Sequence, residues 1–136
     1  MSTIGTVESL WRYPVKSMRG EELPELFAGY AGVYGDRLFA FESSASPRGF
    51  PVFHRTRSTS DDSLPRCSLR IGSKLTVAVL QRDARCMMIT LDPDTAEKTP
   101  AILKAVAQAH EGMAGVYGAV LVEGMMRQGD SVELLN

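Results

Sequence analysis

The chain has 136 residues, which is enough for one domain with a single hydrophobic core. Hydrophobic residues make up 44% and charged residues 23%, as in ordinary globular proteins, and a formal net charge of −1 gives no general electrostatic reason to bind nucleic acid or an anionic membrane. No apolar run approaches the roughly 20 residues that a membrane-spanning helix needs.

Short extended segments separated by glycines and turn residues predict a mostly β protein. The segments expected to form strands are residues 5–15, 35–44, 68–83, 85–91 and 117–124. The third of these holds two extended pieces around the Gly72-Ser73 turn, and Pro14 is expected to end regular pairing in the first. Residues 125–136 are expected to form a closing hairpin around a Gly129-Asp130 turn.

One segment has the pattern of a helix instead. In "TPAILKAVAQAH", Thr99 is a possible N-cap, Pro100 suits the first helical position, and the apolar residues follow the spacing of one helical face. Gly112 supplies a stop. We therefore expect one main helix near residues 100–111, packed on the β domain.

A long loop is predicted at about residues 43–66. Serine, proline and arginine dominate this stretch, and only "FPVFH" within it resembles a regular element. Loops of this length inside compact domains are usually functional or disordered. His54 lies in the loop, and no partner base or nucleophile for it is identifiable from the sequence.

The chain has two cysteines, Cys67 and Cys86, and seven methionines, which suggests a reducing cytoplasmic environment. The N-terminal residues lack the basic start and apolar block of a signal peptide. The cysteine spacing leaves a Cys67–Cys86 disulfide open and does not require one. Zinc binding is not expected, because there is no C-x-x-C pair and His54 and His110 are isolated in the sequence.

The stretch "YPVKSMRG" places Lys16, Ser17 and Arg19 just after a proline-terminated strand. Two cations and a hydroxyl in a strand-end loop can hold a phosphate or a carboxylate through charge-assisted hydrogen bonds. The alternative is an ordinary solvated basic turn.

The stretch "GVYGDR", residues 32–37, offers a second cation. Arg37 has the planar guanidinium that grips anions bidentately, although pairing with Asp36 or another acid is the commoner fate of an arginine. The two glycines are expected to supply positive φ angles in a turn. The spacing is neither that of a dinucleotide-binding fingerprint nor that of a P-loop.

Cys86 is the third candidate. Its thiolate would be the reactive form, and nearby cations favour that form. If residues 82–86 are regularly extended, Arg82 shares a face with Cys86 whereas Arg85 points to the opposite face. The alternative is that Cys86 is a buried apolar residue, as free cysteines often are.

These stretches, in this order, resemble the MOSC family, the domain found at the C-terminus of molybdenum-cofactor sulfurases. The quoted matches are "LWRYPVKSMRGEEL", "GVYGDRLFAF", "RDARCMMITLDPDTAEKTPAILKAVAQ" and "GVYGAVLVEGMMRQGDSVELL". Together they cover residues 5–42 and 68–135, and the chain is similar to the short stand-alone bacterial members.

The resemblance implies a single domain over residues 1–136 with a MOSC-type β-barrel and one main helix. It implies that Cys86 is the catalytic cysteine and metal ligand at the sulfur and molybdenum end of the molybdenum cofactor. Lys16, Ser17 and Arg37 would hold the pterin phosphate. The protein would act as a sulfur carrier or a small oxidoreductase component, with a partner protein supplying sulfur or electrons. Family association also brings in pyridoxal phosphate, for which Lys16 is the only residue worth testing.

The chain departs from the family pattern between the GDR and cysteine strands. Relatives usually have many more residues there, and this region shrinks here to residues 43–66. Three alternatives follow: a loosely bound cofactor, a pocket completed by a partner chain, or loss of binding. In the last case the protein would be a non-catalytic remnant that serves as a binding or interaction module.

Overall fold

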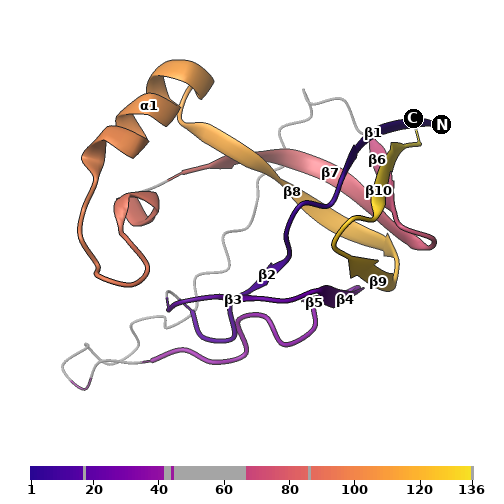
Figure 1. Cartoon of the computed structure of the whole chain (residues 1–136), viewed down its shortest axis with the longest axis horizontal. Coiled ribbons are helices and arrows are strands. Elements are labelled where there is room, and N and C mark those ends of the chain that lie inside the picture. The colour runs from indigo at the N-terminus through magenta and orange to yellow at the C-terminus, as the bar shows by residue number, and fades with distance from the viewer. Residues whose placement is uncertain (17, 42–43, 45–66, 86, 136) are drawn as a thin grey trace.

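The structure, a computed structural model, describes residues 1–16, 18–41, 44, 67–85 and 87–135. Within these ranges the protein is mostly β with a single α-helix, which confirms the predicted fold class (Figure 1). None of the helices in the described ranges has the length and apolar character needed to cross a membrane. Apart from residue 44, the long loop predicted at residues 43–66 lies outside the described residues.

The main sheet is antiparallel and has five strands. In spatial order they are β1 (Ser2–Thr6), β10 (Ser131–Leu134), β6 (Ser68–Ile71), β7 (Leu75–Ala84) and β8 (Met113–Val122). Figure 1 shows β7 and β8 as the long strands that run from the helix to the far end of the molecule. A closed barrel needs its first and last strands to pair. Because β1 and β8 do not pair with each other, the described strands form an open sheet and not the predicted barrel.

Two smaller sheets lie along the other side of the molecule. One contains β5 (Gly32–Val33), β4 (Glu25–Gly29) and β9 (Gly124–Arg127), and the other pairs β2 (Trp11–Arg12) with β3 (Glu21–Glu22). Only Glu123 separates β8 from β9, so the chain passes directly from the main sheet into the three-stranded one. The Glu123 carboxylate accepts the backbone N–H of Tyr30 at 2.9 Å and helps to hold this connection.

The first two predicted strands are wrong in detail. Residues 5–15 contribute to two short strands, β1 and β2, which belong to different sheets. Residues 35–41 form a turn followed by an isolated parallel bridge between Phe39 and Val15. Both segments have the alternating side chains of a strand. Backbone pairing with another segment, however, extends over only one or two consecutive residues at a time in each of them.

The central predictions hold better. The two extended pieces around Gly72 are β6 and β7, and Gly72 has a φ of +62°. The strand predicted at residues 117–124 is β8, which begins earlier, at Met113. The Gly129-Asp130 turn is also present, but β9 and β10 on its two sides pair in different sheets and do not form a hairpin with each other.

The segment after Cys86 is not a strand. Instead, η1 (Met87–Thr90) is a short 3₁₀ helix, and β7 stops at Ala84. The Arg85 N–H donates to the Gly112 carbonyl at 2.9 Å, and the buried Thr90 accepts the Thr99 N–H on its carbonyl at 2.7 Å. Thr99 and Gly112 flank the α-helix α1 (Pro100–His110), so these two bonds tie the segment to both ends of α1 and direct the chain away from the sheet.

The single α-helix, α1 (Pro100–His110), confirms the prediction. Pro100 occupies the start, and Thr99 stands at the N-cap position without a side-chain capping bond. At the other end Glu111 is left-handed with a φ of +56°, and the Gly112 N–H donates to the Val106 carbonyl at 3.2 Å. The helix lies against η1 and the start of β8, and none of its residues is buried.

The apolar core lies where the main sheet meets the three-stranded sheet. Leu75 of β7 is fully buried, and Leu26 and Ala28 of β4 are 4% and 3% exposed. Gly124 of β9 is also buried, and a Cβ placed on it would lie 2.9 Å from the Leu75 backbone nitrogen. Among the described residues only Leu10 joins these as a buried hydrophobic side chain, so the core is small.

Candidate functional site

The two predicted anion-binding turns lie side by side. The Arg37 N–H donates to the Tyr13 carbonyl at 2.6 Å, and the Phe39 N–H donates to the Pro14 carbonyl at 3.1 Å. The Lys16 N–H returns a bond of 2.9 Å to the Phe39 carbonyl. The structure therefore brings together the segments that carry Lys16 and Arg37, although they are 21 residues apart (37 − 16) in the chain. Ser17 lies outside the described residues.

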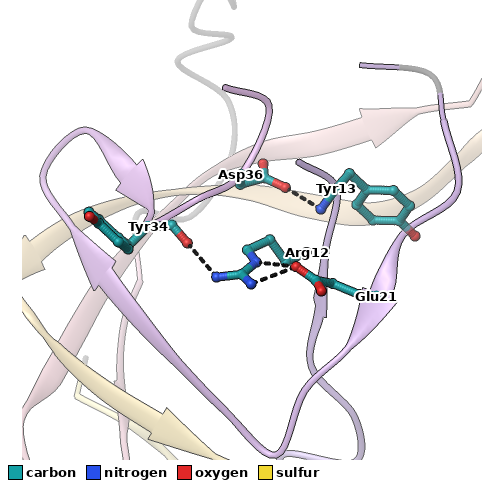
Figure 2. Close-up of polar contacts among 5 residues, drawn as sticks. All are labelled: Arg12, Tyr13, Glu21, Tyr34 and Asp36. Atoms are coloured by element: carbon teal, nitrogen blue, oxygen red, sulfur yellow. Dashed lines mark hydrogen bonds and ion pairs between the residues drawn. The ribbon is translucent and has the colours of Figure 1, made fainter. Parts of the chain in front are cut away.

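Arg12 holds the turn at residues 32–37, which carries Arg37, in position (Figure 2). Its Nε and one terminal nitrogen contact Glu21 Oε1 at 2.7 and 2.5 Å, and its other terminal nitrogen lies 3.4 Å from the Tyr34 carbonyl oxygen. Gly35 follows with a φ of +84°, and a Cβ there would lie 2.8 Å from the Arg12 guanidinium. The Asp36 carboxylate also accepts the Tyr13 N–H at 2.7 Å. The expected positive-φ glycine is confirmed, and the crowding explains the need for it.

Arg37 pairs with Asp36, which is one of the two alternatives that the sequence left open. Its guanidinium forms an ion pair with Asp36 and lies over the ring of Tyr13, 5.4 Å from the centroid. Its side chain nevertheless remains 59% exposed, so a ligand can reach it. Its backbone has a φ of +49°, a conformation that non-glycine residues rarely adopt outside constrained or functional sites.

An ion pair connects the turn at residues 13–20, which carries Lys16, to the segment that follows Cys86. Arg19 contacts the Asp94 carboxylate at 2.5 Å. Asp92 forms the predicted turn, since its carboxylate accepts the N–H groups of Asp94 and Thr95 at 2.8 and 2.9 Å. The hydrogen bonds from Thr95 and Asp94 lower the pKa of Asp92 below its ordinary value. The Lys16 turn and the turn after the cysteine are thus neighbours.

Arg82 contacts the C-terminal end of α1. It donates to the His110 carbonyl at 2.8 Å and pairs with Glu111 at 3.2 Å, so its charge stabilises the C-terminal end of α1. The argument that Arg82 shares a face with Cys86 required regular extension through residues 82–86. β7 extends as far as Ala84, and Cys86 lies outside the described residues, so a contact between Arg82 and the thiolate stays a prediction.

The sequence analysis missed a polar cluster immediately before Cys86. Arg85 donates through Nε to the Ala114 carbonyl at 2.7 Å and pairs with Asp83 at 3.2 Å. The Tyr117 hydroxyl on β8 forms a hydrogen bond with the same Asp83 carboxylate. This hydrogen bond, together with burial, raises the pKa of Tyr117 above its ordinary value, while the positive charges of Arg85 and Arg37 act in the opposite direction. Arg37 is therefore within electrostatic reach of this cluster.

Tyr117 is expected to retain its proton to a higher pH than an ordinary tyrosine. Its stabilising hydrogen bond is fully present below the unfolded-state pKa of about 10 and is lost as the pH rises through the higher folded-state pKa. Alkaline titration of tyrosinate absorbance should lose its latest-titrating component in Tyr117→Phe. Tyr30→Phe, at a tyrosine that is 70% exposed, is the control. Identical titration curves for the two variants would contradict the assignment.

The two cysteines are in different situations. Cys67 is a free, half-buried cysteine just before β6, and its carbonyl accepts the Val79 N–H at 2.9 Å. Cys86 lies outside the described residues, but Arg85 and Met87 on its two sides are placed. Across the described ranges, His, Cys, Asp and Glu side chains form no group of three that could hold a metal ion.

Comparison with known families bears on the same part of the chain. The family model of the MOSC domain matches residues 54–133, which is 80 of 136 residues and includes the cysteine segment, α1 and β8. The match does not extend to Lys16 or Arg37. Searches of curated proteins and of solved structures find no match. Because more than half of the chain is matched, the protein belongs to the MOSC domain family, which is associated with the molybdenum cofactor.

Proposed function

We propose that the protein binds the molybdenum cofactor, with Lys16, Ser17 and Arg37 at its phosphate and Cys86 at its sulfur and molybdenum end. The observation that carries the proposal is the pairing of residues 13–16 with residues 37–39, which places the Lys16 and Arg37 segments together. Membership of the MOSC family supports the identity of the ligand.

The positively charged side chains of Arg37 and Lys16 suit the phosphate end of the cofactor. A phosphate prefers cationic donors, and an arginine can bind it through two parallel hydrogen bonds. The exposed guanidinium of Arg37 meets this requirement, and Arg12 holds the turn that carries it. Lys16 adds a second positive charge on the neighbouring turn.

The sulfur end depends on Cys86. A thiolate is a soft ligand that suits molybdenum or a transferred sulfur atom. When bound, the cofactor would supply the redox-active metal and its sulfur ligands. The protein's own contribution is to fix the cysteine segment: Arg85 binds the carbonyls of Gly112 and Ala114, and Thr90 binds the backbone of Thr99.

The reaction would be sulfur transfer or a small oxidoreductase step. The sequence contains no flavin, haem or iron–sulfur motif, so we propose that a separate protein delivers the electrons or the sulfur.

The test is the molybdenum and pterin content per chain, measured on protein from a host that makes the cofactor. We expect near-stoichiometric molybdenum in the wild type and loss of it in Cys86→Ala. Cys67→Ala, which removes the other cysteine, should retain the metal. Absence of both molybdenum and pterin from the wild type would contradict the proposal and favour the non-catalytic remnant.

A further inference from the structure

Tyr13 contacts the turn at residues 32–37 through both its backbone and its ring. Its N–H donates to one oxygen of the Asp36 carboxylate at 2.7 Å, and its carbonyl accepts the Arg37 N–H at 2.6 Å. The Arg37 guanidinium lies over the Tyr13 ring, 5.4 Å from the centroid, and forms an ion pair with the other Asp36 oxygen. Tyr13, Asp36 and Arg37 therefore form a closed cycle of contacts.

This cycle orients the guanidinium of Arg37. Arginine has a long side chain with much rotational freedom, and one ion pair leaves the plane of the guanidinium free to rotate. An aromatic ring against the guanidinium restricts that rotation. Within the described residues only one terminal nitrogen of Arg37 contacts an acid, so other N–H donors remain for two parallel hydrogen bonds to a phosphate.

Gly20 supports the Tyr13 ring from the same turn that carries Lys16. A Cβ on Gly20 would lie 2.6, 2.9 and 3.0 Å from three carbon atoms of the ring, so the backbone of Gly20 lies directly against it. The φ of Gly20 is not positive. The glycine is therefore explained by the close approach of the ring and not by its backbone conformation.

We propose that Tyr13, packed against Gly20, is a positioning residue for phosphate binding, because its ring holds the Arg37 guanidinium in the orientation that binds the phosphate. This inference rests on the proposed phosphate site and adds to it a residue that acts through Arg37. Apparent affinity falls with the fraction of protein in the binding-competent conformation. Loss of a contact as strong as an exposed cation–π pair should lower that fraction, and hence the affinity, by about two- to fivefold.

The test is a titration of the full-length protein with inorganic phosphate, followed by NMR on the side-chain Nε–H signal of Arg37. The ring current of Tyr13 should shift this signal in the wild type. Tyr13→Leu should abolish the shift and weaken phosphate binding by about two- to fivefold, whereas Tyr13→Phe, which keeps the ring, should preserve both. Tyr34→Leu is the matched control and should behave as the wild type. Tyr34 is 77% exposed in the same turn, with its ring apart from that of Tyr13 (Figure 2).

A second pair of variants displaces the ring without removing it. Gly20→Ala should reduce the ring-current shift and weaken phosphate binding, because the new methyl group would overlap the ring. Gly5→Ala is its control, since a Cβ on Gly5 would have no neighbour within 4 Å among the described residues. Unchanged shift and affinity in Gly20→Ala would contradict the role of Gly20.

Two results would overturn the positioning role of Tyr13 and leave the phosphate site intact. One is wild-type affinity for phosphate in Tyr13→Leu. The other is an equal loss of affinity in Tyr13→Phe and Tyr13→Leu, because the ring would then not be the cause. Absence of phosphate binding by the wild type is a different failure, since it would overturn the proposed phosphate site and this inference with it.

Discussion

Leu75→Ala is expected to lower the free energy of unfolding by about 2–5 kcal/mol, the range for removing a fully buried leucine. Leu75 is 0% exposed, and it lies where β7 meets β9, the strand that pairs with β4. The backbone of Gly124 packs directly against it, so the surroundings have little freedom to close over the cavity. Since few other side chains are buried in the described part, this loss is large relative to a total stability of about 5–15 kcal/mol.

Leu80→Ala is the control for this experiment. Leu80 lies in the same strand, β7, but is 44% exposed, so its truncation leaves no enclosed cavity. Urea denaturation followed by circular dichroism should show a much lower midpoint for Leu75→Ala than for Leu80→Ala. Equal midpoints would mean that the junction of the two sheets is not the stabilising core.

Arg37→Gln is expected to weaken retention of the cofactor by about ten- to a hundredfold, while leaving the fold intact. A hydrogen bond to a charged group contributes about 1.5–3 kcal/mol, and each 1.4 kcal/mol is tenfold in affinity. Glutamine keeps a polar side chain but removes the charge and the two parallel donors. The ion pair with Asp36 is also lost, but exposed pairs contribute only about 0–1 kcal/mol to stability.

Arg127→Gln separates a binding effect from a general loss of charge. Arg127 is 60% exposed and pairs with Glu25, which matches the 59% exposure and single carboxylate partner of Arg37. The measurement is the molybdenum and pterin that remain per chain after serial dialysis, with the thermal midpoint recorded alongside. We expect loss of cofactor only in Arg37→Gln. Equal retention in both variants would remove Arg37 from the proposed phosphate site.

The parts of the fold that the sequence predicted well are those with local signals. Pro100 and the apolar spacing after it are sufficient to locate α1, and Gly72 is sufficient to locate the turn between β6 and β7. Each of these two features depends on residues close together in the chain. The pairing of residues 13–16 with residues 37–39 was not predicted from the sequence pattern, although the family resemblance implied that Lys16 and Arg37 hold one phosphate.

The remaining features depend on contacts between distant residues. Residues 85–91 have the composition of a strand, but hydrogen bonds from Arg85 to Gly112 and from Thr99 to Thr90 direct them away from the sheet. Asp83 and Tyr117 are 34 residues apart (117 − 83), and no motif links them. Arg12 was read only as part of a strand, and its role is defined by Glu21 and Tyr34.

The same hydrogen bonds make the cysteine segment and α1 one cooperative unit. Thr90 binds Thr99 before the helix, whereas Arg82 and Arg85 bind His110 and Gly112 at its end. Neither the helix nor the residues around position 86 can then open without breaking the bonds of the other. In native-state hydrogen exchange, the amides of residues 85–112 should open together, with one free energy and one denaturant dependence.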